Sequence, residues 1–379
     1  MGNSILDVAK KLNKEFSDNT LAIKADITPD YSRLSTGAFG LDYPLYGGLV
    51  YGRITTFSGR EHSGKTSAAC LALGAYQRAN PDKICVYVDV EHSLDLKFQM
   101  RMNGIDPDRL IYFNPKTLTG EQVLDSVLEF QKSDDVGMII IDSIPALLPA
   151  QSMENDIEKD PGMRGTIAKP LHRFLIAMSN LVNQKNNILL LINQARISGT
   201  TFTGAPIYSE PGGDAPKYYS SIKVRFGTRT FIKNGKTDAS DGENAEGFRL
   251  KFVVTKNKCG AVARGGGFIS YSYDKGLMWM EDLLEIAYKF DFIRRINNVT
   301  YQLINLETGE IYKDENGEEL TGKRKELEDY ILNNIAFQTE YLAMLNKYIS
   351  ASDASYGDIL DAREKEEIKQ EEKSVEGNK

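Results

Sequence analysis

Cysteine, histidine and tryptophan are scarce in this sequence of 379 residues, which contains three Cys, three His and one Trp. The cysteines, Cys70, Cys85 and Cys259, are far apart and do not form the close pairs of a metal-binding or disulfide-rich domain. No hydrophobic run approaches the roughly 18 apolar residues of a membrane-spanning helix. Residues 1–7 lack the basic-then-apolar pattern of a secretory signal. These absences predict a cytoplasmic protein with no membrane partner.

The chain also has no excess of positive charge. It contains 46 Lys and Arg residues and 53 Asp and Glu residues, a net charge of −7. This balance excludes a wholly basic nucleic-acid coat, although a local basic strip remains compatible with it. Hydrophobic residues make up 41% of the chain and charged residues 26%, which excludes a disordered or collagen-like chain. The length predicts about two to three domains.

Strand-length apolar runs alternate with amphipathic stretches in a predicted core of residues 34–279. Near-continuous Ile, Leu and Val runs separated by helices indicate an α/β fold with a mostly parallel central sheet covered on both faces. The last strands follow one another without helices, which predicts an antiparallel extension at one edge. The predicted strands are residues 53–58, 84–90, 110–113, 137–141, 188–193, 222–226 and 248–255, and the predicted helices are 65–78, 120–132 and 169–184.

Three further segments surround this core. Residues 1–33 form a predicted arm, with an amphipathic helix over 4–16 and a short strand over 21–23. The arm is too small to hold a core, so it packs either on its own domain or on another. Residues 280–361 form a predicted small α+β domain with helices over 282–290, 325–333 and 339–349 and a hairpin of 301–304 with 310–312. Residues 362–379 are almost wholly charged and form a predicted disordered tail.

The most specific motif is a G-x-x-x-x-G-K-T loop at residues 59–66, after a predicted strand and before a predicted helix. In this context glycines let backbone N–H groups converge on nucleotide phosphates, Lys65 supplies a positive charge, and the Thr66 hydroxyl is a ligand for Mg²⁺. His62 is either catalytic or, as we prefer, a solvent-facing residue. The predicted phosphate-binding residues are Gly59, Arg60, Glu61, His62, Ser63, Gly64, Lys65 and Thr66.

Acidic residues end two of the predicted strands. Asp142 follows four apolar residues and is predicted as the second Mg²⁺-side group beside Thr66. Glu91 lies beyond the last apolar residue of its strand, where the strand meets the nucleotide, and is predicted as the general base that activates water. A plain helix N-cap is the alternative for Glu91. Asp89 is interpreted as an ordinary helix or loop contact.

The order and spacing of these motifs resemble the RecA family of ATP-dependent DNA recombinases. The likeness extends from the arm to about residue 349 and includes residues 35–53 before the phosphate loop. Glu91-His92-Ser93-Leu94-Asp95 is similar to the family's E-H-A-L-D, and residues 191–196 are similar to its I-N-Q-x-R. Lys256-Asn257-Lys258 is similar to its K-N-K. The resemblance implies a RecA-like P-loop ATPase core with ATP and Mg²⁺ as cofactors.

The resemblance also implies roles for residues outside the phosphate loop. Gln194 would sense the γ-phosphate, although a strand-end Gln alone would more simply make turn hydrogen bonds. Phe98 would stack on the adenine, and Asp95 would be a further ATP-binding residue. Lys256 and Lys258 would reach the ATP of a neighbouring subunit. Without the resemblance, lysines on an edge strand would be interpreted as residues that discourage aggregation. Apart from Arg60 within the loop, no arginine is predicted to lie beside the phosphate site, so these lysines would supply the cations.

Two loops would face DNA, at about residues 153–165 and 197–217. The second shows little helix or strand pattern and contains Phe202 and Tyr208, whose rings are able to stack on bases. A merely flexible surface loop is the alternative. The first loop is unexpectedly acidic, and Pro170 interrupts the helix that follows it. The positions implied to bind DNA are Arg164, Gly165, Lys169, Arg196, Gly212 and Gly213.

Taken together, the resemblance implies a protein of homologous recombination and repair. It would form a helical homopolymer on single-stranded DNA, hydrolyse ATP when DNA is bound, and exchange strands with homologous double-stranded DNA. The arm would link subunits, and residues 323–325 are candidates for duplex capture. Single-strand-binding and loader proteins would assist, and the protein would act in the bacterial cytoplasm, encoded by the host or by a phage. The alternatives are a ring-forming helicase motor and a non-catalytic regulator of the same fold.

Overall fold

The structure is a computed structural model, and it describes residues 5–15, 31–150, 167–203, 206–233, 236–238, 242–260, 265–289, 291–305 and 308–350. Contacts divide the chain into two units, residues 1–32 and 33–379. In the first unit, α1 (Ile5–Glu15) matches the predicted amphipathic helix, and its apolar residues Ile5, Leu6 and Val8 are exposed. The predicted strand at 21–23 lies outside the described residues.

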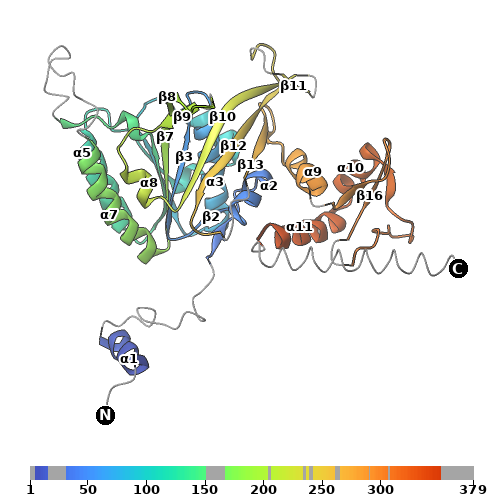
Figure 1. Cartoon of the computed structure of the whole chain (residues 1–379), viewed down its shortest axis with the longest axis horizontal. Coiled ribbons are helices and arrows are strands. Elements are labelled where there is room, and N and C mark those ends of the chain that lie inside the picture. Colours follow the sequence, from blue (N-terminus) through green and yellow to red (C-terminus); the bar gives the residue numbers. More distant parts are fainter. Residues whose placement is uncertain are drawn as a thin grey trace. The chain divides into compact units, whose positions relative to one another are not determined.

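The second unit contains a ten-stranded sheet (Figure 1). Five neighbouring pairs, from β10 to β5, run parallel, and the strands on the other side of β10 pair antiparallel. This arrangement confirms the mostly parallel sheet with an antiparallel extension. Its spatial order is β14 (Gly276–Leu277), β13 (Gly266–Ser272), β12 (Gly247–Asn257), β10 (Ile222–Lys233), β3 (Arg53–Gly59), β7 (Ile188–Gln194), β6 (Val136–Asp142), β4 (Ile84–Asp89) and β5 (Leu110–Phe113), with β11 (Lys236–Asp238) beside β10.

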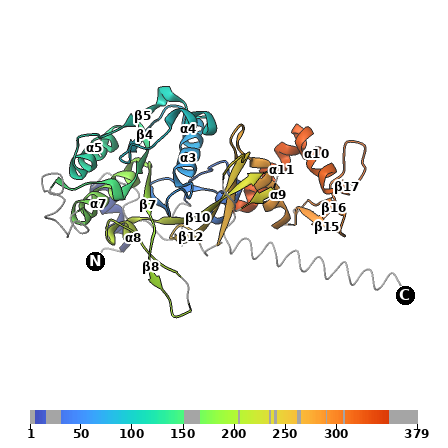
Figure 2. The ribbon, with the colours of Figure 1, turned by 90° about the horizontal axis from the view of Figure 1, so that it is seen from above.

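Helices cover both faces of this sheet because its central strands are apolar on both sides; every residue of β6 is buried. On one face, α3 (Lys65–Ala79) and α4 (Leu96–Asn103) pack together (Figure 2). On the other face, α5 (Gly120–Lys132) packs beside α7 (Ala168–Lys185). Each pair of helices covers its own hydrophobic cluster. The carboxyl ends of the parallel strands therefore open on one common edge.

Short elements complete the core. β1 (Arg33–Leu34) pairs with β2 (Leu49–Val50), and α2 (Phe39–Asp42) runs into the 3-10 helix η2 (Tyr43–Leu45). Two further 3-10 helices are η3 (Pro107–Arg109) and η4 (Ile144–Ala146). Across the described parts of the chain, no helix combines the length and apolar character needed to cross a bilayer.

Several features of the core differ from expectation. The second predicted DNA loop is not patternless: β8 (Arg196–Thr200) and β9 (Pro206–Ser209) pair as a hairpin, and α8 (Ala215–Tyr219) follows. Every residue of β8 is exposed, so the sequence lacks the alternation of apolar and polar residues that indicates a half-buried strand. Strand β13 was not predicted. Pro170 does not break α7, because it lies in the first helical turn, where a backbone N–H has no helical partner to lose.

The C-terminal part has its own hydrophobic cluster, which includes Phe292, Ile331 and Tyr341. The predicted hairpin of 301–304 with 310–312 is reduced to one bridge, Ile304 with Ile311, because β16 pairs instead with strands on both sides. The elements are α9 (Trp279–Lys289), β15 (Ile293–Arg295), β16 (Thr300–Leu303), β17 (Thr321–Lys323), α10 (Arg324–Asn333) and α11 (Ile335–Ser350).

Candidate functional site

The phosphate loop joins the end of β3 to the start of α3. Gly64 precedes the helix with φ +83°, a conformation that favours glycine. A Cβ on Gly59 would lie 2.6 Å from the Ser63 hydroxyl and 2.7 Å from the Phe226 carbonyl, so a larger residue would not fit. Arg60, Glu61 and His62 are exposed. The loop therefore combines exposed side chains at Arg60, Glu61 and His62 with a closely packed backbone at Gly59.

Lys65 is buried at the first position of α3, with 8% of its surface exposed. Its ammonium donates to the Arg60 carbonyl oxygen at 2.7 Å, inside the loop. Burial lowers the pKa of Lys65, and the carboxylates of Asp142, Glu91 and Glu61 oppose that shift. A poorly solvated cation held within a phosphate-type loop interacts strongly with an anion placed there.

Thr66 and Asp142 meet beside the loop. The Thr66 hydroxyl donates to Asp142 Oδ2 at 2.8 Å, and the Tyr87 hydroxyl donates to the same oxygen at 2.6 Å. Burial raises the pKa of Asp142 to about 6, although these two hydrogen bonds lower it. A hydroxyl and a carboxylate are the hard oxygen ligands that Mg²⁺ prefers when it also keeps water and phosphate oxygens. The two predicted Mg²⁺-side residues therefore fit the ion chemically.

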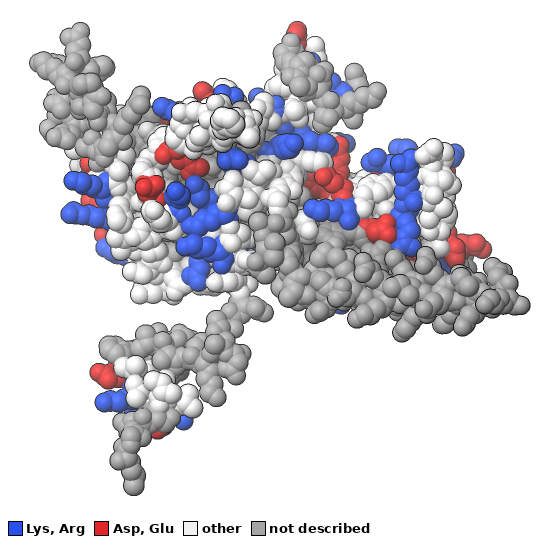
Figure 3. All heavy atoms as spheres, in the orientation of Figure 1, with Lys and Arg blue, Asp and Glu red and all other residues white. Residues whose placement is uncertain are grey.

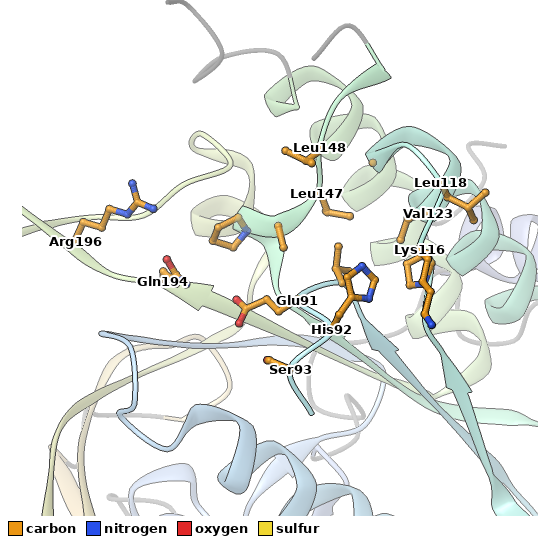
Figure 4. A pocket seen from close by; sticks show the side chains of 15 residues that line it. Glu91, His92, Ser93, Lys116, Leu118, Val123, Leu147, Leu148, Gln194 and Arg196 are labelled. Carbon is orange, nitrogen blue, oxygen red and sulfur yellow. The ribbon is translucent and has the colours of Figure 1, made fainter. Parts of the chain in front are cut away.

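Glu91 lies just beyond β4 and is exposed, and it accepts a hydrogen bond from the Ser143 hydroxyl. It lines a hollow of about 550 Å³ together with Gln194 and Arg196. Figure 4 shows the carboxylate of Glu91 and the amide of Gln194 facing the same open space. Glu91 is not a helix N-cap, because Asp95 caps α4. The assignment of Glu91 as general base stays a prediction.

Asp89 has a different environment from Glu91. It is buried, and its carboxylate accepts from the Tyr112 hydroxyl at 2.6 Å and from the backbone N–H groups of Ser93 and Leu94. These bonds fix the turn that follows β4. Asp89 therefore makes structural contacts, as interpreted from the sequence, and it helps to position the turn that carries Glu91.

Gln194 ends β7, and its register partner on β3 is Gly59. The next residue, Ala195, donates its backbone N–H to the Gly59 carbonyl at 2.9 Å. Gln194 is therefore half-buried at the border between the phosphate loop and the hollow that Glu91 lines. Two residues later the chain enters β8.

The predicted ATP-binding residues Asp95 and Phe98 lie at the start of α4, Asp95 as its N-cap and Phe98 in its first turn. The Asp95 carboxylate accepts from the Phe98 backbone N–H at 3.0 Å. The Phe98 ring is half-buried, with the Arg101 guanidinium 5.8 Å from its centroid. Neither residue lines the hollow shared by Glu91 and Gln194. The structure groups these two residues with each other rather than with the catalytic candidates.

Lys256 and Lys258 lie in a second hollow, of about 750 Å³, beside α8. The Lys256 ammonium donates to the carbonyls of Lys217 at 2.6 Å and Tyr218 at 3.3 Å. Burial, together with the charges of Lys258, Lys223 and Lys217, lowers the pKa of Lys256 to about 8. Neither lysine lines the hollow that contains Glu91 and Gln194.

Arg225 was missed by the sequence reasoning, which placed no further arginine near the phosphate loop. Parallel pairing of β10 with β3 puts Arg225 opposite Ser58, and it shares a small hollow with Gly59 and Arg60. No pattern near the phosphate loop in the sequence indicates Arg225, because β3 and β10 lie far apart along the chain. Only their pairing in the sheet brings Arg225 to the loop.

The family described as RecA N-terminal domain matches residues 4–278 of this chain. The chain belongs to the RecA family. A Protein RecA from Mycoplasma mobile is 31% identical over 350 residues, 92% of this chain and 95% of the relative. A Protein RecA from Sulfurovum sp. (strain NBC37-1) is 31% identical over 293 residues, 76% of this chain and 80% of the relative. A solved structure titled "Crystal structure of the RadB recombinase" matches with TM-score 0.45 and 21% identity over 64% of this chain and 98% of that one.

Membership of the RecA family makes the chain a nucleotide-binding recombination protein with a P-loop ATPase core. The positions that the resemblance assigns to DNA are spread over two segments of this RecA-family core. Arg164 and Gly165, and the whole loop 153–165, lie outside the described residues. Lys169 is exposed in the first turn of α7, and Arg196 is exposed at the start of β8.

Gly212 and Gly213 have a packing role in this RecA-family protein. Both have positive φ, +92° and +71°. A Cβ on Gly212 would lie 2.8 Å from Leu171 and 3.0 Å from Ile144, so this glycine lets the segment approach α7 and η4. By contrast, the hairpin projects from the body of the core (Figure 2), and Phe202 at its tip is fully exposed. The hairpin, rather than the glycine turn, offers side chains to a ligand.

Proposed function

We propose that this protein is a DNA-dependent ATPase that forms helical filaments on single-stranded DNA and exchanges strands with homologous double-stranded DNA. One observation carries the proposal. Gln194 pairs in register with Gly59 of the phosphate loop, and the exposed β8–β9 hairpin begins two residues later. A change at the nucleotide therefore has a path of two residues to the segment that would contact DNA.

Each residue at this edge has a proposed task. Lys65 and the loop backbone bind the phosphates, Phe98 stacks on the base, and Asp95 completes the nucleotide site. Thr66 and Asp142 hold Mg²⁺, which supplies charge neutralisation at the phosphates when it is bound. Glu91 orients and deprotonates the attacking water, and Ser143 holds its carboxylate in place. Gln194 reports whether the γ-phosphate is present.

Assembly of subunits explains the position of the lysine pair. Lys256 and Lys258 sit in a separate hollow from Glu91, so we assign them to the nucleotide of an adjacent subunit. Ile5 and Val8 of α1 are exposed apolar residues, and we assign this helix to a contact with an adjacent subunit. A head-to-tail contact of this kind that does not close on itself generates a helical filament.

DNA binding is assigned to the two loops. Arg164, Gly165, Lys169 and Arg196 meet phosphates, and the exposed ring of Phe202 stacks on or between bases. Gly212 and Gly213 supply backbone close to the strand. The basic residues 323–325 of the C-terminal part capture duplex DNA. The named relatives are bacterial, and we propose a host- or phage-encoded cytoplasmic protein assisted by single-strand-binding and loader proteins.

Electron microscopy tests the assembly. Protein with single-stranded DNA and a slowly hydrolysed ATP analogue should form long helical filaments. Closed rings would indicate a helicase-type motor instead, and dispersed monomers would indicate a regulator.

Substitution of Glu91 tests the chemistry. Glu91→Gln should lower DNA-dependent ATP hydrolysis by on the order of 100-fold while leaving nucleotide binding intact, because it removes only the general base. A matched variant is Asp89→Asn, which alters the turn after β4 and should reduce thermal stability as well as rate. A rate near that of the unmodified protein in Glu91→Gln would remove the assignment.

A further inference from the structure

The hollow around Lys256 and Lys258 gathers more positive charge than the lysine pair itself. Three other cations line it, Lys217, Lys223 and Arg225. Figure 3 shows Lys and Arg side chains gathered on the face that carries α8 and the adjoining ends of the sheet strands. Two carboxylates also line the hollow, those of Glu210 and Asp214. Five cations and two carboxylates leave a surface suited to a multiply charged anion.

Glu210 makes the ion pair of this hollow. Its Oε2 lies 2.8 Å from the Lys223 ammonium, and the two side chains are only 20% and 12% exposed. An ion pair shielded from solvent in this way is screened less by salt than a surface pair. Glu210 follows β9 directly, so it belongs to the segment that the function assigns to DNA.

The same segment has three further attachments. The Arg225 guanidinium lies 4.4 Å from the centroid of the Tyr208 ring. The Asn193 side chain, next to Gln194, donates to the Pro211 carbonyl at 3.0 Å. Gly212 packs against Ile144, two residues beyond Asp142. Residues 208–212 are therefore joined to the cation hollow, to the Gln194 strand end and to the Asp142 strand end.

We propose that Glu210 is a positioning residue whose carboxylate serves as an internal counter-anion for the cation hollow. In the free subunit it neutralises Lys223 and holds residues 208–212 against β10. The phosphates of an adjacent subunit's nucleotide carry several negative charges, and they displace this single carboxylate when they reach Lys256 and Lys258. Displacement releases residues 208–212, so that the β8–β9 hairpin, which is already exposed, is free to move onto DNA. This inference rests on the proposed function.

The test compares ATP hydrolysis with and without oligo-dT in the full-length protein. Glu210→Gln breaks the ion pair and keeps the size of the side chain. We expect hydrolysis without DNA to rise about fivefold and hydrolysis with DNA to stay within about twofold, so that stimulation by DNA falls about fivefold, within the range of measured coupling between sites. Affinity for oligo-dT in the absence of nucleotide should rise by a similar factor. Asp106→Asn, which breaks the 2.7 Å pair with Arg109 elsewhere in the core, is the matched control.

A double variant that exchanges the two charges tests whether the ion pair itself, rather than either residue alone, controls stimulation by DNA. Glu210→Lys combined with Lys223→Glu restores an ion pair, and stimulation by DNA should return towards that of the unmodified protein. Equal loss of hydrolysis with and without DNA in Glu210→Gln, together with a lower melting temperature, would show a merely structural contact and overturn the inference. Unchanged stimulation would also overturn it. If the unmodified protein hydrolyses no ATP even with DNA, the proposed function itself fails, which is a distinguishable result.

Discussion

The phosphate-binding edge and the β8–β9 hairpin adjoin each other in the chain, yet they are built in opposite ways. At the phosphate edge, Lys65 and Asp142 are almost fully buried and have specific hydrogen-bond partners. In the hairpin, every residue of β8 is exposed, and so is Phe202. At the phosphate edge, the free-energy cost of burying charged groups is met when the protein folds, before any ligand binds. The side chains of the hairpin make their contacts only when a ligand binds. Phosphate chemistry needs preorganised charge, and an unpaired strand of any sequence needs accessible rings and cations.

The largest effect should follow from Lys65→Ala at the preorganised edge. Loss of the phosphate-facing charge should lower DNA-dependent ATP hydrolysis by on the order of 1000-fold, as expected for removal of a transition-state cation. Steady-state hydrolysis measured with saturating oligo-dT checks this. Arg78→Ala, on the same helix but far from the loop, should retain most of the activity. Similar rates in the two variants would show that Lys65 matters no more for hydrolysis than a residue far from the loop, and would contradict the prediction.

Asp142→Asn should reveal the cost of the buried carboxylate. The pKa of Asp142 is raised from 3.8 to about 6, so the folded state binds its proton more tightly than the unfolded state does. Stability from this group is therefore present below about pH 4 and is lost as pH rises to 6. The variant should be more stable than the unmodified protein at pH 7 by on the order of 3 kcal/mol, and equally stable near pH 4. Urea unfolding at both pH values measures this, and an equal difference at both would contradict it.

Phe202→Ala should affect binding without affecting the fold. The ring is fully exposed, so the free energy of unfolding should change by less than about 0.5 kcal/mol. Loss of one stacking side chain should weaken binding to oligo-dT on the order of tenfold. Fluorescence anisotropy at fixed salt is the measurement. Ile335→Ala, which removes an exposed side chain from the C-terminal part, is the control and should bind normally.

The smallest effect should come from the titration of Lys256. Its pKa is lowered to about 8, so about half of its charge is lost at pH 8 and most of it by pH 9. At ATP concentrations well below KM, where the rate reports the protein before nucleotide binds, DNA-dependent hydrolysis should fall by about half between pH 7 and pH 8 in the unmodified protein. Lys256→Arg keeps its charge over this range, and its rate should stay level. Parallel pH profiles for the two proteins would show that Lys256 does not act as a cation in the reaction.

Much of the core could be predicted because its patterns are local. The helix at 120–132 agrees residue for residue with α5, which Thr119 and Gln122 begin with a capping box. The apolar run before Asp142 predicted a buried strand, and β6 is buried throughout. The β8–β9 hairpin could not be predicted this way, because a fully exposed strand has no alternation of apolar and polar residues.

The candidate site shows the same division. The phosphate-loop residues are consecutive, and Glu91 and Asp142 each end an apolar strand, so short patterns identify them. The partners of these residues were not predictable. The Tyr87 hydroxyl on Asp142, the Ser143 hydroxyl on Glu91 and the placement of Arg225 beside the phosphate loop all depend on which strands are neighbours.

The sequence by itself determined the phosphate loop, the parallel core and the family, because each rests on residues close together in the chain whose spacing has a direct physical meaning. Only the tertiary structure decided which side chains share a carboxylate, which lysines share a hollow, and that Glu210 neutralises Lys223. Those contacts arise from strand order and register, which bring residues far apart in the chain to within hydrogen-bonding distance, and no local pattern encodes that order.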